Sequence, residues 1–407
     1  MQHLCLAPAA LSACVLLSLP AAAADWPNWR GPDHNGVSQE TGWISKWPAD
    51  GPRQLWKASV GTGFSSIAVA KGRACTMGNQ QDVDTVYCFD AETGGNLWKF
   101  SYACPADPNL YEGGPSATPS FDGNRVYAVS KKGGLYCLDA EKGAVIWSKN
   151  VAGEAGAALP MWECAGSALV RGDLIILDIG AAGVALDKNT GRVVWSSGKE
   201  SGGYSTPVPA SFEGAPAVVI VSFQAVFGVE IKSGRQLWSL PWKTQYNLNI
   251  ADAIVSGDDV FVSSGYDHGA SVVRVKGATP KVVWENRNLR NHINSSVLAG
   301  GYLYGVDGGV NTSGAATLKC LDFATGNEKW DYKGLGGGAF MMADRKIIML
   351  SDKGELVVAD ATPEGFNPIS RAQVLGGKCW TVPTLANGRI YCRNAKGDLV
   401  CLDVKGH

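Results

Sequence analysis

The sequence predicts an all-β, eight-bladed β-propeller with four-stranded antiparallel blades. Its 407 residues include 51 Gly and 14 Trp, and only 18% of them are charged, which is typical of many short strands joined by tight turns. Two independent repeats then run along the chain, and one of them occurs eight times. A repeat of this kind makes a single ring from a length that would otherwise suit two ordinary domains.

The first repeat consists of an acid, a Gly four residues later and a Trp eight residues after the acid. The acid side chain can accept N–H bonds within the turn, the Gly supplies a position of positive φ, and the Trp packs between neighbouring sheets. The five copies are Asp90-Gly94-Trp98, Asp139-Gly143-Trp147, Asp187-Gly191-Trp195, Glu230-Gly234-Trp238 and Asp322-Gly326-Trp330.

The second repeat is a turn followed by an apolar strand. It occurs at residues 72–73, 123–127, 172–174, 214–215, 257–261, 301–304, 344–347 and 388–391. Seven intervals therefore separate Gly72 from Gly388, at about 45 residues each, which is the length of a four-stranded propeller blade.

The two ends of the chain are predicted to close the ring. Gln54-Leu55-Trp56 is typical of an outer strand but follows no acid-Gly turn, whereas Leu402-Asp403 begins such a turn without a later Trp. We expect residues 53–60 to complete the last blade, which leaves no open sheet edge between the termini. Residues 25–407 then form one domain, with residues 25–52 as an N-terminal extension.

Blades five and seven depart from the acid-Gly-Trp pattern. Trp284 follows Gly277 without an aligned acid, and Asp360 is followed by Pro363 and Gly365 without a Trp. The residues predicted to dock neighbouring blades are accordingly Trp56, Trp98, Trp147, Trp195, Trp238, Trp284 and Trp330.

The segment from Leu138 to Trp147 resembles the repeat of propellers of the pyrroloquinoline-quinone (PQQ) type. That family holds both quinoprotein alcohol dehydrogenases and BamB-like assembly factors, and the resemblance runs from about Trp56 to Asp403. The segments Trp26–Pro32 and Asn35–Ser38 are similar to the opening of many exported members whose activity is not established. The resemblance is specific for fold and only weakly specific for function.

Residues 1–24 are predicted to be a signal peptide. They contain no Lys, Arg, Asp or Glu, and an apolar stretch from Val15 to Leu19 leads into the small residues Ala21–Ala24. We expect cleavage after Ala24 and a periplasmic or secreted protein. A lipobox ending at Cys14, which would anchor the chain through a lipid, is the alternative. No later segment is long and apolar enough to predict a transmembrane helix.

Charge and cysteine content narrow the possible partners. The net charge of −1 gives no basic excess, which makes nucleic acid a poor candidate. Nine Cys remain after the predicted cleavage, an odd number, so at least one is expected to be unpaired. No cysteine spacing indicates a zinc site, and no metal ligands are predicted.

The candidate ligand site lies in the loops that join each outer strand to the next inner strand, because these loops surround one mouth of the channel. Their mixture of aromatic, amide and charged side chains suits a planar or polar ligand. The alternative is that the polar groups only satisfy the loop backbone. The candidate residues are Trp162, Glu163, Tyr204, Tyr246, Asn247, Asn249, Arg290, His292, Lys378 and Trp380.

No catalytic residues are predicted, and three functions remain open. The leading one is a non-catalytic binding or scaffolding protein of the cell envelope, with protein partners or a small planar or polar ligand. The second, implied by the resemblance, is an alcohol dehydrogenase in which PQQ stacks on a Trp and Glu163 with Asn247 or Asn249 holds Ca²⁺ near Asp252. The absence of two neighbouring Cys residues argues against it. The third is a carbohydrate- or peptide-binding module.

Overall fold

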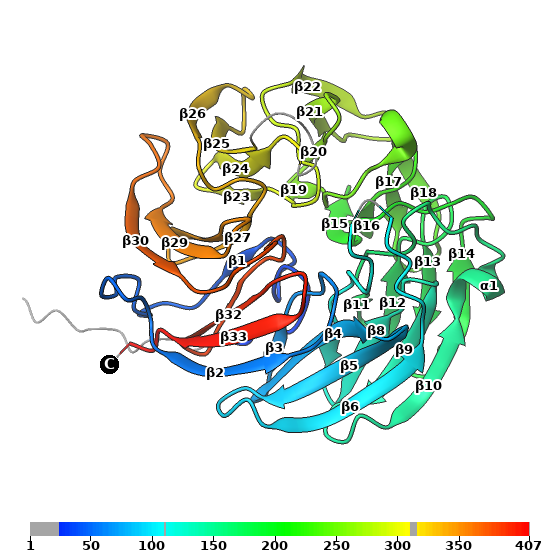
Figure 1. Ribbon diagram of the computed structural model, residues 1–407. Helices are drawn as coiled ribbons and strands as arrows, with labels where there is room; N and C mark the ends of the chain where they lie inside the picture. The colour runs from blue at the N-terminus through cyan, green and yellow to red at the C-terminus, as the bar shows by residue number, and fades with distance from the viewer. Residues whose placement is uncertain (1–23, 110, 310–315, 407) are drawn as a thin grey trace, which may run out of the picture.

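The computed structural model describes residues 24–109, 111–309 and 316–406, which form eight sheets arranged as a ring (Figure 1). Blades one to four are β3 (Ala68–Ala70), β4 (Arg73–Gln80), β5 (Val83–Asp90) and β6 (Asn96–Ala103); β7 (Ser120–Asp122), β8 (Arg125–Val129), β9 (Gly134–Asp139) and β10 (Val145–Asn150); β11 (Leu169–Arg171), β12 (Leu174–Leu177), β13 (Val184–Asp187) and β14 (Val193–Ser196); and β15 (Val208–Phe212), β16 (Ala215–Val221), β17 (Ala225–Glu230) and β18 (Gln236–Pro241).

The remaining blades follow in chain order. They are β19 (Ile254–Ser256), β20 (Asp259–Ser264), β21 (Gly269–Arg274) and β22 (Lys281–Asn286); β23 (Val297–Ala299), β24 (Tyr302–Asp307), β25 (Thr317–Asp322) and β26 (Glu328–Tyr332); β27 (Ala339–Ala343), β28 (Lys346–Leu350), β29 (Glu355–Asp360) and β30 (Pro368–Gln373); and β31 (Thr384–Ala386), β32 (Arg389–Arg393), β33 (Asp398–Asp403) and β2 (Gln54–Ser59). The predicted eight-bladed, four-stranded architecture is confirmed, and all eight turn-strand markers lead into the second strand of a blade.

The position of a strand in its blade explains its sequence. Central strands such as β28 are covered on both faces by neighbouring blades and are almost continuously apolar and buried. Outer strands such as β10 alternate between exposed and half-buried side chains. Regular helix in the described residues is limited to α1 (Val151–Ala155) and the 3-10 turn η1 (Gln245–Asn247), and neither is long enough to cross a membrane.

The ring closes through its first outer strand, as predicted. β2 pairs antiparallel with β33, with Trp56 opposite Cys401. A second link joins blade eight to blade one: the fully buried Arg393 of β32 donates to the carbonyls of Met77 (2.6 Å), Ser65 (3.0 Å) and Gly61 (3.1 Å). Burial lowers the pKa of Arg393 to about 9, and these carbonyls replace the water that the guanidinium loses.

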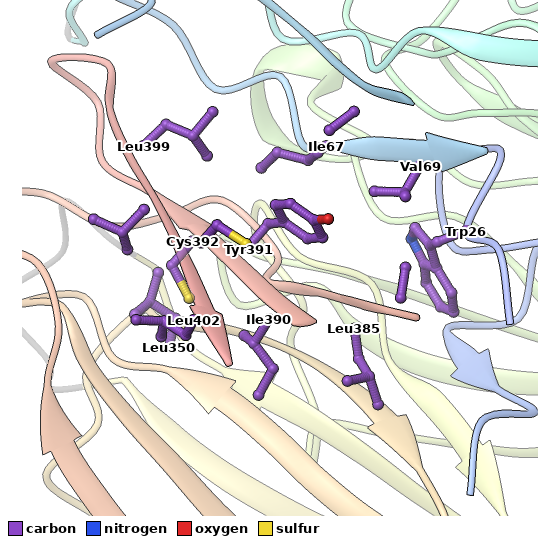
Figure 2. Close-up of a cluster of buried hydrophobic side chains, with 14 of the residues drawn as sticks. Trp26, Ile67, Val69, Leu350, Leu385, Ile390, Tyr391, Cys392, Leu399 and Leu402 are labelled. Carbon is purple, nitrogen blue, oxygen red and sulfur yellow. The ribbon is translucent and has the colours of Figure 1, made fainter. Parts of the chain in front are cut away.

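The N-terminal extension is part of the ring. Trp26 exchanges backbone hydrogen bonds of 2.8 Å with Val69 of β3, and Figure 2 shows its indole beside Val69 and Leu385. Further along, β1 (Val37–Ser38) pairs in parallel with β27 and makes blade seven five-stranded. The extension is therefore packed against the inner strands of blades one and seven, the two neighbours of blade eight.

Tryptophans of the outer strands contact the next blade in a recurring way. The indole Nε1 donates to a backbone carbonyl in the following blade, and a Gly of the neighbouring turn lies under the ring in five of the seven contacts. The acceptors are Ala91 for Trp56 (3.2 Å), Ala140 for Trp98 (3.0 Å), Lys188 for Trp147 (3.3 Å), Ile231 for Trp195 (2.8 Å), Phe323 for Trp284 (2.8 Å) and Thr362 for Trp330 (2.8 Å).

Trp238 differs from the other six tryptophans. It is 1% exposed, its Nε1 has no hydrogen-bond partner within the described residues, and it packs edge-on against Phe212 at 5.5 Å. Its neighbour is blade five, where the acid-Gly turn is degenerate. The geometry of this contact thus changes where the repeat changes.

The acids of the turns accept backbone N–H groups where the acid is Asp. Asp90, for example, accepts from Glu92 (3.0 Å) and Thr93 (2.8 Å). Glu230 is the exception, because its longer side chain accepts from the Ser233 hydroxyl and the Arg235 guanidinium instead.

All nine cysteines of the described residues are buried and unpaired. Cys75 of β4 lies directly opposite Cys88 of β5. The predicted signal peptide, with the alternative lipid-anchored Cys14, lies outside the described residues apart from Ala24.

Candidate functional site

A cavity of about 700 Å³ lies at the mouth of the channel. Its walls are mainly the loops that precede the inner strands, to which Trp29 of the N-terminal extension and Tyr266 of the β20–β21 turn are added. Aromatic rings from eight separate segments line it: Trp29, Phe64, Tyr111, Trp162, Tyr204, Tyr246, Tyr266 and Trp380.

Five of the ten candidate residues predicted from sequence line this cavity, and all five carry rings: Trp162, Tyr204, Tyr246, His292 and Trp380. Their rings contact one another or other aromatic residues of the wall. Trp162 and Tyr204 lie 6.3 Å apart between ring centroids, and Trp380 stacks on Phe64 at 5.5 Å. The cavity wall is therefore a set of supported aromatic surfaces.

The charged candidates Glu163 and Lys378 lie outside the cavity lining and are paired. Glu163 forms ion pairs with Lys131 at 3.0 Å and with Lys132. Lys378 forms an ion pair of 2.9 Å with Glu112, and its ammonium lies 4.2 Å from the ring centroid of Trp380. Each of these charges is thus balanced by an opposite charge on another loop.

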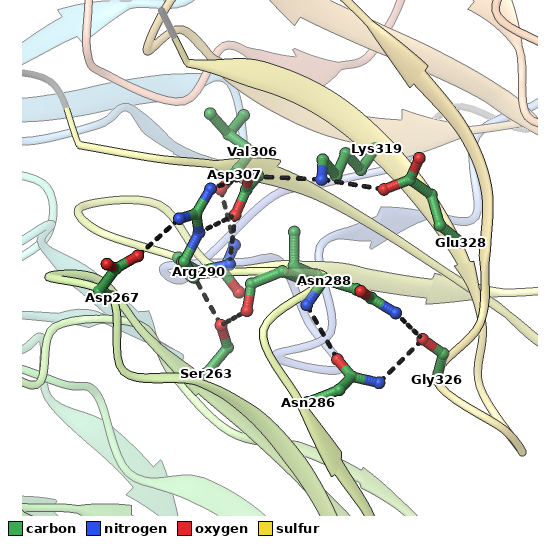
Figure 3. Close-up of polar contacts among 12 residues, drawn as sticks. Ser263, Asp267, Asn286, Asn288, Arg290, Val306, Asp307, Lys319, Gly326 and Glu328 are labelled. Atoms are coloured by element: carbon green, nitrogen blue, oxygen red, sulfur yellow. Dashed lines mark hydrogen bonds and ion pairs between the residues drawn. The ribbon is translucent and has the colours of Figure 1, made fainter. Parts of the chain in front are cut away.

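Arg290 is held in a network of carboxylates (Figure 3). It forms ion pairs with Asp307 at 2.8 Å and Asp267 at 2.7 Å, and Asp307 lies 3.5 Å from Lys319, which also pairs with Glu328. Hydrogen bonds to Asp307 and Asp267 raise the pKa of Arg290. The guanidinium supports its loop and is not among the residues that line the cavity.

The two candidate amides also lie outside the cavity lining. Asn249 is fully buried, donates to the carbonyls of Ser222 (3.0 Å) and Trp242 (3.1 Å), and accepts from the Ser264 hydroxyl (2.9 Å). Asn247 belongs to η1 and has a φ of 52°, a conformation that Asn tolerates better than most residues. Asn249 therefore holds the loop together.

Two residues at the base of the cavity complete the site. The indole Nε1 of Trp29 donates to the Asp252 carboxylate at 2.6 Å, and the Arg30 guanidinium lies 3.8 Å from the same oxygen. Arg30 is itself buried and donates to the Ser296 carbonyl at 2.7 Å. Burial raises the pKa of Asp252, and the charge of Arg30 opposes that shift.

A belt of hydrogen bonds links six blades around the base of the cavity. In this polar belt, the backbone N–H at one position donates to the side-chain oxygen at the equivalent position of the next blade. The bonds run from Ser66 to Thr118 (3.0 Å), Thr118 to Ser167 (2.9 Å), Ser167 to Thr206 (2.9 Å), Thr206 to Asp252 (2.7 Å) and Asp252 to Ser295 (2.9 Å).

Sequence reasoning missed the polar belt and Trp29, although both leave a signal. Every belt residue stands two positions before an inner strand, and blades seven and eight have Gly337 and Val382 there instead. Trp29 belongs to a segment that matches no blade repeat. A motif without a place in the ring is a candidate for the ring's interior.

The donors expected for PQQ with Ca²⁺ do not fit that group in this arrangement. Glu163 is paired with two lysines, the amide of Asn249 is bonded on both its oxygen and its nitrogen, and Asp252 is bound by Trp29 and Arg30. Glu163, Asn247 and Asn249 also lie outside the cavity lining, although the side-chain oxygen of Asn247 is buried without a hydrogen-bond partner among the described residues. Across the described ranges, no three His, Cys, Asp or Glu residues gather as metal ligands would.

Comparisons with solved structures agree with the fold. BamB from Moraxella catarrhalis matches 87% of this chain and 98% of its own, with a TM-score of 0.61 and 17% identity. Quinohemoprotein alcohol dehydrogenase from Comamonas testosteroni matches 95% of this chain and 82% of its own, with a TM-score of 0.71 and 12% identity. A europium-containing methanol dehydrogenase matches 91% of this chain and 89% of its own, with a TM-score of 0.70 and 11% identity.

These identities support a shared fold and leave the activity open, because both a BamB and two dehydrogenases share it. No curated protein matches the sequence. The family model described as outer membrane protein assembly factor BamB matches residues 82–332, more than half of the chain. The chain therefore belongs to this BamB-like family of PQQ-type propellers.

Proposed function

We propose that this chain is a non-catalytic binding protein of the cell envelope and that the cavity at the channel mouth is its binding site. One observation carries the proposal: aromatic rings from loops all around the ring line a single cavity, while the charged groups next to them are paired with each other. Such a site can hold a ligand through ring faces and hydrogen bonds. Among the described residues, the one carboxylate in its lining, Asp252, is bound by Trp29 and Arg30.

The envelope location rests on the predicted signal peptide. Mass spectrometry of the exported protein tests it, with an N-terminus at Asp25 as the expected result. An acylated Cys14 would instead place the protein on a membrane surface. The family description names an outer membrane assembly factor. This supports a second, scaffolding role in which the chain binds protein partners as well as a ligand.

Native mass spectrometry tests the binding role directly. The mature protein is incubated with the low-molecular-weight fraction of an envelope extract, and we expect a bound mass that Trp380→Ala loses. Leu97→Ala, an exposed outer-strand change far from the channel, is the control and should keep that mass. A wild-type protein with no bound mass would contradict the proposal.

A PQQ- and Ca²⁺-dependent dehydrogenase is the competing function. Titration of the mature protein with PQQ and Ca²⁺, followed by absorbance and by a dye-linked alcohol assay, separates the two. We expect neither stoichiometric PQQ nor turnover, because Glu163, Asn249 and Asp252 are bound to other groups. Stoichiometric PQQ with alcohol oxidation would overturn the binding role.

A further inference from the structure

We propose that the cavity is a one-entrance site for uncharged carbohydrate and that the segment Trp26–Pro32 is its closed floor. The inference rests on the proposed function, since it specifies what the channel site binds. Three features carry it: the path of the N-terminal extension, the balance of charge around the cavity, and the chemistry of the polar belt.

The extension crosses the channel beneath the cavity. Trp26 is bonded to β3 of blade one and the Pro27 carbonyl accepts from Phe121 of β7 in blade two, whereas Arg30 reaches Ser296 of blade six. The chain then pairs with β27 of blade seven. Trp29 lies in the middle of this crossing and is the residue that meets the cavity.

The far end of the extension reaches the face of the ring that lies opposite the cavity. The Glu40 carboxylate accepts from the backbone N–H groups of Asn387 (2.7 Å) and Gly388 (2.6 Å), in the turn that follows the inner strand β31. Inner strands begin at the cavity and end at such turns, so the extension fills the channel from the cavity downward. A ligand must therefore enter from the side of Trp162 and Trp380.

The cavity holds no uncompensated charge. Asp252 is the one carboxylate among its lining residues in the described chain, no Lys or Arg lines it, and the Asp252 oxygens are bound by Trp29, Arg30 and the Thr206 N–H. A charged ligand would lose its hydration here without gaining a counter-charge. An uncharged ligand avoids this cost.

The polar belt suits hydroxyl groups. The Ser167 and Thr206 side chains line the cavity, and each accepts one backbone N–H, which leaves the hydroxyl proton able to donate to a ligand. Above them stand aromatic faces such as Trp162 and Trp380. Sugars present apolar C–H faces and hydroxyl edges, and about 700 Å³ falls within the range of about 300–1,000 Å³ for small-ligand sites.

A glycan array carrying neutral and anionic oligosaccharides, probed with the mature protein, tests the ligand class. We expect binding to neutral glycans, and titration of the best one should show an affinity loss of about tenfold or more in Trp162→Ala and in Trp380→Ala. Trp47→Phe, a change at a half-buried Trp of the N-terminal extension that does not line the cavity, is the control and should retain the affinity. An empty array, or a preference for anionic glycans, overturns the inference.

The floor is tested by charge selectivity. Asp252→Asn leaves the Arg30 charge without its carboxylate. We therefore expect the affinity for anionic glycans to rise relative to that for neutral glycans, which would not happen if Asp252 only stabilised the fold. Trp29→Phe removes the indole donor to Asp252 together with part of the ring, and it should weaken the binding of neutral glycans by about fivefold or more, with the melting temperature as a check on folding. An unchanged affinity and an unchanged selectivity in Trp29→Phe would overturn the floor, even if Asp252→Asn failed to fold.

These outcomes separate the two proposals. A bound mass in the envelope experiment together with an empty glycan array rejects carbohydrate but keeps the binding role. Alcohol oxidation with PQQ rejects both.

Discussion

The outer rim of this propeller and its channel are built on opposite rules. On the rim, six indoles donate to carbonyls of the next blade within a narrow range, from 2.8 Å for Trp195 to 3.3 Å for Trp147. In the channel, the polar belt repeats over six blades, but the other lining residues vary from loop to loop and the base is crossed by a segment that belongs to no blade. The contrast teaches that the repeat specifies the ring, whereas departures from the repeat specify the site.

The largest expected effect comes from removing the strand that closes the rim. Deletion of residues 53–60 removes β2 and leaves β33 as an open edge, so we expect a loss of unfolding free energy above the ~4–5 kcal/mol of the most damaging single substitutions. Chemical denaturation measures it. Lys57→Ala, an exposed change in the same strand, should be nearly neutral, and an unchanged denaturation midpoint after the deletion would refute closure by β2.

A pair of tryptophans compares rim and channel directly. Trp195→Ala removes a 9% exposed ring and its bond to Ile231, so a loss of about 3–5 kcal/mol is expected. Trp162→Ala opens an existing cavity further and should cost less than about 1.5 kcal/mol. Urea denaturation of both variants measures the two losses. Equal losses of unfolding free energy would mean that Trp162 at the mouth stabilises the fold as much as Trp195 on the rim.

Two glycines sharpen the contribution of the rim contact. Gly143 has a φ of 68°, and a Cβ there would lie 2.5 Å from the Trp98 ring, whereas Gly123 has a φ of 60° with open space around it. Gly143→Ala should cost about 2–4 kcal/mol, from the left-handed backbone and the clash, and Gly123→Ala about 1–2 kcal/mol, from the backbone alone. If thermal or chemical denaturation gave the two variants equal losses, the Gly-Trp contact would carry no energy.

The smallest expected effect concerns two acids of blade three. Asp187 on the rim is half-buried and accepts turn N–H groups, whereas Asp178 near the channel is buried, and burial raises its pKa to about 7. A raised carboxyl pKa favours the protonated native state, so the contribution of Asp178 is lost as pH rises from about 4 through about 7. The melting temperature of Asp178→Asn, relative to wild type, should therefore be higher at pH 8 than at pH 5.

Asp187→Asn should behave in the opposite sense. Hydrogen bonds from Thr190 lower the pKa of Asp187, so its contribution is present at neutral pH and is lost as the solution becomes acidic. The variant should be less stable than wild type at pH 7 and approach it near pH 3. If the stability of the two variants relative to wild type changed with pH in the same direction, the proposed difference between the rim acid and the channel acid would be wrong.

The sequence predicted the ring well because the ring depends on local spacing. The acid, Gly and Trp of each turn lie within nine residues, and Gly72 through Gly388 mark every blade. The site depends on contacts that spacing does not encode. Trp29 meets Asp252 across 223 residues, and Glu163 meets Lys131 only because two loops are neighbours in the ring.

The candidate residues divide along the same line. The rings of Trp162 and Trp380 were identifiable as mouth residues, because large aromatic groups in those loops have no blade to fill. The roles of Arg290 and Asn249 were not identifiable, because the sequence does not show whether a charged or amide side chain contacts a ligand or a polar group of the protein.

Closure by β2 also sets the order in which the protein can fold. Arg53 and Asp403, which pair at 2.8 Å beside the β2–β33 junction, are 350 residues apart, so β2 is synthesised before the other strands of its blade and long before its partner β33. Chains fold from the N-terminus during synthesis, and unpaired strand edges in partly folded chains promote aggregation. Blades one to seven can assemble as the chain emerges, but β2 must wait through that entire interval. The ring is completed only after β33 has been made, and β2 is the segment that most needs protection until then.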